Sequence, residues 1–431
     1  MELSRRVFIK NGALGLVSIG LSPVLGPSFV QCAAAQSNAA DRRKTLVCLF
    51  MRGAADGLSI VVPHGEPELY RARPGIGIPR DQVVDLDGFF GLHPALSPIA
   101  PMFKQGHLAI VHACGSPSNS RSHFDAMDFM ESGSPDDRTV HDGWLARAAK
   151  LTGSKQVDAP FRAIAIGSGM PRSLQGDQAA LAIPDLKSFG IYETVAPNNN
   201  KVKSAAAPTQ GLAGGFEALY DSAAIDALHG TGRESFEALR ALKGINAKSY
   251  TPEHGAVYPQ GKLGESFKQI AQLIKANVGV EIAFTEAGGW DTHANQSQPG
   301  SPSQGALATR LKDVAESLAA FYADLGDRMS DVVVLTMSEF GRTVKQNGTG
   351  GTDHGHASCF FALGGPIKGG KVYGDWPGLA TEQLYESRDL AMTTDFRSVF
   401  GEVACKHLGV TNVANLFPNF TGGEVSFRGL I

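Results

Sequence analysis

Six mostly apolar runs of strand length recur along the chain. They cover residues 45–51, 107–113, 161–166, 278–284, 331–336 and 357–363. These runs lack the strict alternation of polar and apolar positions that a half-exposed strand shows. Continuous runs are typical of strands that are covered on both faces, as in a parallel sheet. The pattern therefore predicts six buried strands.

The segments between these runs carry apolar residues at steps of three and four, which is the period of an amphipathic helix. The clearest covers residues 304–329, with Leu307, Leu311, Leu318 and Leu325 in one stripe. Further helices are predicted at about residues 94–104, 123–131, 143–151, 214–228, 232–243, 263–276 and 394–408. Strands that alternate with helices form βαβ units, so the pattern predicts an α/β sandwich around a mostly parallel sheet.

One stretch interrupts this alternation. Residues 195–215 contain three asparagines and an alanine run but few large apolar side chains, which is typical of a linker. We interpret the helical segment that follows as an insertion or cap. The linker and helical insertion together span about residues 195–277, within one α/β domain at residues 41–431.

The first 35 residues have the pattern of a removed export signal. Arg5 and Arg6 are followed by Phe8 and Lys10, then by a short apolar run and small residues that end at Ala35. Paired arginines in this setting match the twin-arginine signal, which is an address and not a membrane anchor. We expect the twin-arginine (Tat) translocase to be a partner during export and the mature protein to lie in the periplasm or outside the cell.

Charge and cysteine usage exclude some classes of function. Cleavage after residue 35 removes three basic residues and one acidic residue, which leaves 36 Lys+Arg against 41 Asp+Glu. Such a chain has no electrostatic footprint for nucleic acid or for an anionic membrane, and no later run is long enough to anchor it in a bilayer. Four scattered cysteines remain, Cys48, Cys114, Cys359 and Cys405, for which buried thiols and a disulfide both stay open.

Polar clusters follow several predicted strands, at the edge where ligands bind in open α/β sheets. Arg52 and Asp56 come directly after the first run. A carboxylate at this place can hold a cation or orient a base. Because an Asp-Gly pair is also common in turns, the two interpretations of Asp56 are equally supported.

A serine-rich cluster follows the second run. Ser122 with Asp125 three positions later has the pattern of a capping box that opens a helix. A hydroxyl at that position also lies where backbone N–H groups favour an oxyanion or a phosphoryl group. In that case Arg121 would clamp the anion.

Two further clusters combine carboxylates with imidazoles. Asp291 and His293 follow the fourth run, and Asp353, His354 and His356 lie within four residues that lead into the last run. Oxygen and imidazole ligands together suit zinc, manganese or iron. Two divalent cations that polarise an ester oxygen and activate a nucleophile need ligands of this kind. The chain has no P-loop, dinucleotide fingerprint or G-x-S-x-G motif, which counts against nucleotide transfer and serine-esterase chemistry.

Five of these stretches, taken together, resemble DUF1501, a family of exported bacterial proteins of unknown function that is usually placed in the alkaline phosphatase superfamily. They are residues 52–57, 120–126, 288–293, 338–343 and 351–356. That superfamily includes sulfatases and cofactor-independent phosphoglycerate mutase. The resemblance runs over nearly the whole mature chain. It implies an alkaline-phosphatase-like three-layer sandwich with a helical insertion.

The superfamily pattern implies two divalent metal ions, zinc, manganese or similar. Besides the serine nucleophile, the ligands of the first ion would be Asp56, Asp353 and His354. The ligands of the second would be Asp291, His293 and His356. Because Glu339 occupies the end of the fifth run, it is either a ligand itself or an outer partner of one. The nucleophile is either Ser120, which follows an asparagine as in the mutase motif, or Ser122, the better helix cap.

The resemblance implies a metal-dependent hydrolase of phosphate or sulfate esters, with a small-molecule or polymer substrate. Arg52, Arg121 or Arg342 would clamp the anion while the two cations stabilise its oxygens. A transferase or mutase with the same site is not distinguished from a hydrolase by sequence. The alternative class is a non-catalytic, metal-stabilised binding or assembly protein whose helical insertion contacts an exported protein partner.

Overall fold

The computed structural model describes residues 43–152, 161–177, 180–186 and 250–431. The described residues from Lys44 onwards belong to one compact unit. The expected export signal, the linker at 195–215 and the helices expected at 214–228 and 232–243 lie outside the described residues.

A single large sheet forms the centre of this unit. Its strand order is β11-β5-β10-β9-β1-β8-β6-β7, and β12 also pairs with β5. The strands are β1 (Thr45–Arg52), β5 (Leu108–Gly115), β6 (Ala163–Ile166), β7 (Leu181–Ile183), β8 (Ile282–Gly288), β9 (Val332–Met337), β10 (Ser358–Gly364), β11 (Val372–Tyr373) and β12 (Thr394–Asp395). All six predicted strands are present. The run predicted at 278–284 overlaps only the start of β8, which ends four residues later, closer to the polar cluster.

The sheet is mostly parallel, as predicted. β1 pairs in parallel with β8 and β9, and β6 pairs in parallel with β8 and β7. The exception is β10, which is antiparallel to both β9 and β5. Antiparallel neighbours need no crossover helix, and the chain returns from β9 into β10 through loop residues 338–357. The start of β10 therefore lies at the same edge as the carboxyl ends of β1, β8 and β9.

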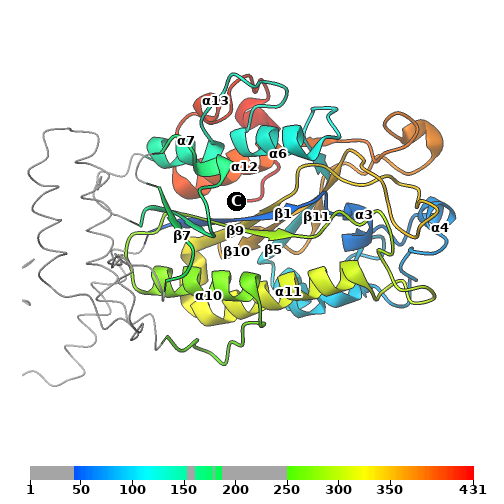
Figure 1. Cartoon of the computed structure of the whole chain (residues 1–431), viewed down its shortest axis with the longest axis horizontal. Coiled ribbons are helices and arrows are strands. Elements are labelled where there is room, and N and C mark those ends of the chain that lie inside the picture. Colours follow the sequence, from blue (N-terminus) through cyan, green and yellow to red (C-terminus); the bar gives the residue numbers. More distant parts are fainter. Residues whose placement is uncertain (1–42, 153–160, 178–179, 187–249) are drawn as a thin grey trace, which may run out of the picture. The chain divides into compact units, whose positions relative to one another are not determined.

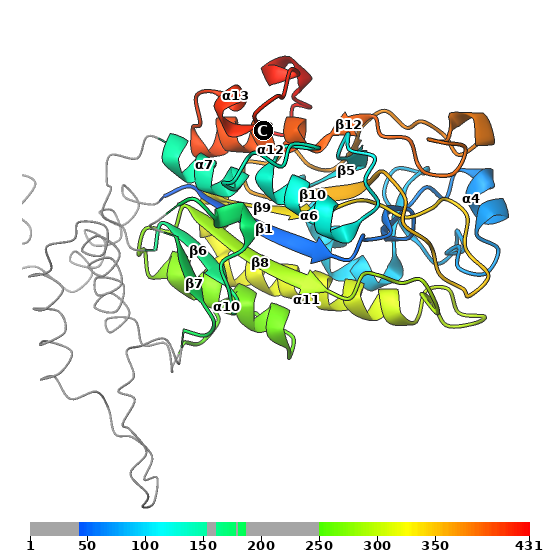
Figure 2. The ribbon, with the colours of Figure 1, turned by 45° about the horizontal axis from the view of Figure 1, so that its top comes forward.

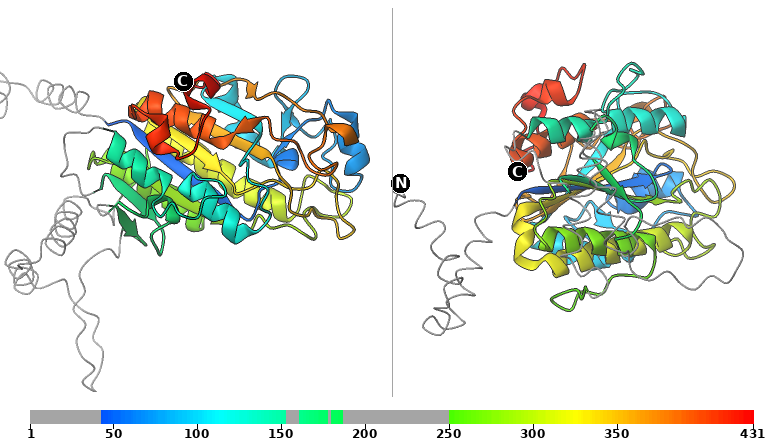
Figure 3. Two further views of the ribbon diagram at one scale, coloured as in Figure 1. Left: turned by 90° about the horizontal axis from the view of Figure 1, so that it is seen from above. Right: turned by 60° about the vertical axis from the view of Figure 1, so that its left-hand side comes forward.

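Helices cover both faces of the sheet (Figure 1; Figure 3, right). One layer contains η1 (Pro94–Ile99), α5 (Ala100–Lys104), α10 (Lys262–Lys275) and α11 (Ala306–Leu325). The other contains α6 (His123–Ser132), α7 (Trp144–Leu151), α12 (Phe396–Val403) and α13 (Val413–Leu416). Along β1, Val47 and Leu49 pack with the first layer, whereas Leu46 and Cys48 pack with the second. The three-layer α/β architecture is thereby confirmed, and burial on both faces accounts for the continuous apolar runs.

Most predicted helices appear close to their expected bounds. The helix expected at 94–104 starts as the 3₁₀ segment η1 before it becomes α5, and Pro98 and Pro101, which lack an N–H, lie on either side of this change. The helix expected at 394–408 is α12 followed by one π-helical turn, η5 (Ala404–Leu408). We interpreted residues up to 277 as an insertion, but α10 buries Phe267 and Ile270 in the main core. This helix is therefore part of a core layer.

Several shorter helices and strands lie at the end of the sheet where the polar clusters are found. They include α3 (Gly57–Ile60), α4 (Pro67–Ala72) and a small antiparallel sheet of β2 (Val61–Val62), β4 (Gly91–Leu92) and β3 (Val84–Asp85). The remaining short helices are η2 (Arg172–Leu174), η3 (Gly326–Asp331), η4 (Thr381–Gln383) and η6 (Gly423–Ser426).

The four described cysteines are all free thiols, and Cys48, Cys114 and Cys359 are buried. Of the two interpretations that the sequence left open, buried thiols fit the structure. Burial raises the pKa of Cys48 and of Cys359, so these thiols stay protonated and unreactive. Among the described helices, none combines the length and the apolar composition needed to cross a bilayer.

Candidate metal centre

Segments next to four different strand ends lie at the carboxyl edge of the parallel strands, of which Figure 2 shows β1 and β8 side by side. Asp291 and His293 follow β8, Glu339 and Arg342 follow β9, His123 begins α6 after β5, and His354 precedes β10. The antiparallel direction of β10 explains why a residue that precedes a strand shares an edge with residues that follow strands. Ligand sites in open α/β sheets form at this edge.

Two glycines allow the backbone segments of the site to touch. Gly53 has a φ of +117°, and a Cβ added to it would lie 2.8 Å from the backbone nitrogen of Asp291. A Cβ added to Gly351 would lie 2.4 Å from the carbonyl oxygen of His293. The segment with Asp291 and His293 is therefore held between the turn after β1 and the loop before β10, because no side chain separates them.

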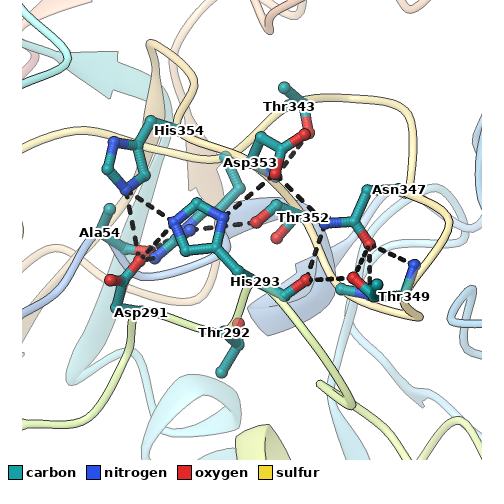
Figure 4. Close-up of polar contacts among 12 residues, drawn as sticks. Ala54, Asp291, Thr292, His293, Thr343, Asn347, Thr349, Thr352, Asp353 and His354 are labelled. Carbon is teal, nitrogen blue, oxygen red and sulfur yellow. Dashed lines mark hydrogen bonds and ion pairs between the residues drawn. The ribbon is translucent and has the colours of Figure 1, made fainter.

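Three imidazoles converge on one carboxylate. The Oδ1 atom of Asp291 lies 3.0 Å from Nε2 of His293, 3.3 Å from Nε2 of His354 and 3.5 Å from Nε2 of His123. The Nε2 atoms of His293 and His354 are themselves 2.9 Å apart, and Figure 4 shows these two rings and Asp291 turned toward one another. His123, Asp291 and His354 lie close enough to hold a metal ion, with ligand atoms within 4.8 Å of one another.

Each of the three histidines also makes a hydrogen bond through its other ring nitrogen. The acceptors are the carbonyl oxygen of Arg121 for His354 (2.8 Å), Oε1 of Glu339 for His123 (2.8 Å) and Oδ1 of Asp353 for His293 (3.1 Å). Carbonyl and carboxylate oxygens only accept, so each Nδ1 donates its proton. In the neutral rings, every Nε2 is then left with a lone pair that faces the cluster, which is the tautomer that metal ligands need.

The electrostatics of the cluster fit a cation. Nε2 of His123 is buried and has no hydrogen-bond partner among the described residues. The hydrogen bond to Glu339 raises the pKa of His123, because that carboxylate favours positive charge on the ring. Burial lowers the pKa of His354, which favours the neutral form of its ring. The carboxylate behind His123 would stabilise a metal ion at Nε2 as it stabilises a proton there, and in the neutral rings the inward nitrogen atoms are acceptors.

Arg342 fixes the carboxylate at the centre of the cluster. Its buried guanidinium donates to Oδ1 of Asp291 at 2.6 Å and to the carbonyl oxygens of Gly53 (2.5 Å) and Ala54 (2.7 Å). Partial burial alone would raise the pKa of Asp291, but the hydrogen bond and charge of Arg342 outweigh it and lower this pKa to about 2. Arg342 thus acts on Asp291 and the backbone, and its guanidinium is not free to clamp an anion.

Asp56 lies outside this cluster, contrary to the predicted first metal site. Its carboxylate is almost fully buried and accepts from Nη1 of Arg73 (2.6 Å), Nη2 of Arg73 (2.9 Å) and Nε2 of Gln296 (2.7 Å). Burial alone would raise the pKa of Asp56, but the paired guanidinium and the hydrogen bonds keep it below its ordinary value. With both oxygens engaged by donors, Asp56 serves as an internal counter-ion.

The other predicted ligands divide into outer partners and a remote residue. Glu339 and Asp353 contact Nδ1 atoms of the cluster histidines, so Glu339 fits the outer-partner alternative that the sequence left open. His356 is buried, stacks on the ring of Tyr385 with centroids 4.3 Å apart and lies outside the cluster. Burial also lowers the pKa of His356.

Both candidate nucleophiles lie in the segment that leads into α6. Ser122 occupies the N-cap position, but its side chain makes no capping hydrogen bond, and Asp125 pairs with Arg138 instead of completing a capping box. The hydroxyl of Ser120 accepts a hydrogen bond from the backbone N–H of Ser122 at 3.3 Å. The residue after Ser122 is His123, so both serines precede a cluster histidine by at most three positions.

Two arginines that we expected to clamp an anion are already paired. Arg52 contacts Glu286 at 2.5 Å and Glu131 at 2.8 Å. The second expected clamp, Arg121, contacts Glu386 at 2.6 Å and Asp389 at 2.7 Å. Each guanidinium is thus neutralised by two carboxylates, and neither is free for a substrate in this arrangement.

His123 is the cluster residue to which sequence reasoning gave no role. His123 lies within residues 120–126, but in that stretch only the two serines and Arg121 were predicted to be functional. The available signal was its position, because it is the first residue of a helix that follows a buried strand at the ligand-binding edge. The pairing of Asp56 with Arg73 had no signal in the sequence.

Comparisons with known proteins agree with the resemblance that the motifs carry. The pattern of the family described as "Protein of unknown function (DUF1501)" matches residues 88–417. No curated protein matches the chain.

Solved structures that are similar to the chain include three enzymes. The PsFucS1 sulfatase from Pseudoalteromonas sp. has 14% identity and a TM-score of 0.37, with 90% of this chain and 72% of that one covered. The lipoteichoic acid synthase LtaP from Listeria monocytogenes has 9% identity and a TM-score of 0.35, with 91% and 76% covered. The phosphonate monoester hydrolase of Agrobacterium radiobacter has 12% identity and a TM-score of 0.34, with 86% and 75% covered. Likeness at this level carries no argument about activity.

Proposed function

We propose that this chain, which belongs to the DUF1501 family, is an exported metal-dependent hydrolase of phosphate or sulfate esters. The observation that carries the proposal is the convergence of three imidazoles on Asp291 at the ligand-binding edge of the sheet. In most buried histidine clusters, each ring nitrogen that accepts a hydrogen bond faces a donor, and each that donates faces an acceptor. Here the inward atoms are all acceptors, apart from the guanidinium of Arg342.

The openness of the cluster favours catalysis over a purely structural metal. The side chains of Asp291 and His293 are 46% and 44% exposed, and those of His123 and His354 are about half as exposed. Structural metal sites are closed by protein ligands, whereas catalytic sites keep a position for water or substrate. An ester that approaches from solvent would therefore reach the cluster without rearrangement of the sheet.

The start of α6 supplies the feature that suits an anionic ester. A divalent metal ion at the cluster would polarise an ester oxygen and lower the pKa of a bound water. The first N–H groups of α6 have no intrahelical acceptor, and the helix dipole favours negative charge at this end. Because His123 is the first residue of this helix, those N–H groups lie beside the cluster, and the hydroxyl of Ser120 or Ser122 is the candidate nucleophile.

A second candidate function is a non-catalytic protein that the metal stabilises. The observation in its favour is that Arg52 and Arg121 are already neutralised by carboxylates. Anionic substrates are usually held by free guanidinium groups, and these two would first have to leave their partners. The two functions differ in turnover.

The test is an assay of purified protein with aryl phosphates and aryl sulfates after removal of metals and reloading with Zn²⁺ or Mn²⁺. We expect metal-dependent turnover that Asp291→Asn abolishes and that either Ser120→Ala or Ser122→Ala strongly reduces. Val425→Ala, at a residue that is 97% exposed on η6, is the control and should keep the wild-type rate. Absence of turnover in protein that demonstrably binds metal would exclude the hydrolase and leave the non-catalytic function.

Export by the twin-arginine route is tested separately in cells. Replacement of both signal arginines, Arg5→Lys with Arg6→Lys, should leave the full-length chain in the cytoplasm, because the translocase reads the arginine pair. The wild-type chain should appear in the periplasmic fraction as a shorter product. An unprocessed wild-type chain in the cytoplasm would contradict export.

A further inference from the structure

The number of metal ions in the cluster follows from where the remaining candidate ligands are engaged. The superfamily pattern asks for two ions, with Asp56 and His356 as necessary ligands. Among the described residues, Asp56 is saturated by Arg73 and Gln296, and His356 is stacked on Tyr385. Glu339 and Asp353 are occupied by the Nδ1 atoms of His123 and His293. With Asp56 paired and His356 outside the cluster, each of the two ions in the superfamily pattern lacks one of its ligands.

The donor atoms that do face one another form a single set. They are Nε2 of His123, Nε2 of His293, Nε2 of His354 and a carboxylate oxygen of Asp291. An ionised carboxylate has two lone pairs on each oxygen, so the bond from Arg342 to Oδ1 does not exhaust it. Three nitrogen donors and one oxygen donor from three chain segments complete the protein part of one metal site.

His123 is the residue that distinguishes this set from the superfamily pattern. It lies one position after Ser122, at the helix start where that pattern places the nucleophile. Its ring is held from behind by the fully buried carboxylate of Glu339, which also accepts the backbone N–H of Gly53 at 2.8 Å. This support fixes the ring with its partnerless Nε2 toward Asp291.

We infer that the protein binds one divalent metal ion, and not two, through Nε2 of His123, His293 and His354 and a carboxylate oxygen of Asp291. Glu339 and Asp353 are positioning residues that hold two of the rings. The inference rests on the metal dependence in the proposed function but not on the hydrolytic activity. A single ion in this set makes His123 as necessary for metal binding as His354.

The test is a titration of the metal-free full chain with Zn²⁺, with elemental analysis of the loaded protein and Co²⁺ absorption as a second readout. We expect one equivalent of metal per chain. His123→Gln should lower the Zn²⁺ affinity by at least about tenfold, the scale already reached when an outer partner of a ligand is removed. It should also change the visible Co²⁺ spectrum. Phe124→Ala, at the next residue and 91% exposed, is the matched control and should leave both unchanged.

Two results would overturn the inference. One is two equivalents in the wild type, of which one is lost in Asp56→Asn. The other is a folded His123→Gln with the affinity and Co²⁺ spectrum of the wild type, and His123→Asn provides a second variant should the first not fold. Turnover assayed on the same samples separates the two proposals. One equivalent without turnover contradicts the hydrolase alone, and two equivalents with turnover contradict the single site alone.

Discussion

Two aspartates that follow neighbouring strands of the same sheet have opposite surroundings. Asp56 follows β1 and Asp291 follows β8, and the two strands are paired in parallel. Asp56 is 1% exposed and meets only donors, from Arg73, Gln296 and Ser59. Asp291 is open to solvent and meets one donor, Arg342, while its other near neighbours are the lone pairs of three imidazoles.

The comparison teaches that position at a strand end does not by itself make a carboxylate a ligand. What decides is whether the neighbouring atoms already satisfy it. A buried carboxylate surrounded by donors is a finished ion pair, and the protein must keep it intact to avoid an isolated buried charge. A carboxylate such as that of Asp291, which meets one guanidinium and three acceptor nitrogens, keeps lone pairs without a donor and is available to a metal ion.

The largest effect should come from breaking the finished pair. Asp56→Asn leaves the guanidinium of Arg73 buried without a counter-ion, and loss of one partner of a buried pair typically costs about 3–5 kcal/mol. Chemical denaturation of the metal-free protein measures this loss. Asp81→Asn, at an exposed position, is the control and should stay within about 0.5 kcal/mol of the wild type. A cost for Asp56→Asn as small as that of the control would contradict the role of Asp56 as a counter-ion.

The same pair should make stability depend on pH in a defined direction. The pKa of Asp56 is lowered in the folded state, so its contribution is present above the unfolded value of about 3.9 and is lost as pH falls through the lower folded value. The difference in unfolding free energy between wild type and Asp56→Asn should therefore be largest near pH 7 and shrink below about pH 4. If the difference in unfolding free energy instead grows as the pH falls, the pKa of Asp56 is not lowered in the folded state.

The open cluster should instead reveal itself through ligand-linked stability. Zn²⁺ at about 100 times its dissociation constant should stabilise the wild type by about 2.7 kcal/mol, because it binds only the folded state. Asp291→Asn should lose most of this gain. Asp56→Asn should keep it, although its starting stability is lower. Thermal or chemical unfolding with and without Zn²⁺ provides the measurement, and equal gains in wild type and Asp291→Asn would remove Asp291 from the site.

The backbone contact at Gly351 offers a finer test of how the cluster is held. Gly351→Ala puts a methyl group against the carbonyl of His293, so we expect a loss of about 1–3 kcal/mol in stability and weaker metal binding. Gly348→Ala in the same loop is the matched control, because an added Cβ there meets nothing within 4 Å. If the two variants behave alike, the close approach of the loops does not matter for the site.

The smallest effects should separate the two positioning carboxylates. The side chain of Glu339 is fully buried, whereas that of Asp353 is 58% exposed. Glu339→Gln should lower Zn²⁺ affinity by about tenfold or more, in the range found for outer partners of metal ligands. Asp353→Asn should have a smaller effect, because solvent screens its interaction with His293. Titrations under identical conditions decide, and the reverse order would show that burial does not control this support.

Much of the fold was predictable from the sequence. The continuous apolar runs gave the six strands, and the helical periodicity gave α6, α7, α10 and α11 within a few residues. These features depend on local patterns and on burial of both sheet faces, which a single chain segment already encodes. The direction of β10 was not predicted, because an apolar run does not show in which direction its strand will pair. Antiparallel pairing needs only a loop in place of a crossover helix.

The candidate site, like the fold, was predictable in part. By themselves, the residue types and their places after strands determined that carboxylates, imidazoles and serines gather at one edge of an α/β sheet, and Asp291, His293 and His354 do so. Only the tertiary structure decided that Asp56 is an ion pair and that His123 joins the cluster. The partners responsible are remote in sequence: Gln296 is 240 positions from Asp56, and Glu339 is 216 positions from His123. A polar atom's role depends on what packs against it, and that is set by long-range packing and not by neighbours in the chain.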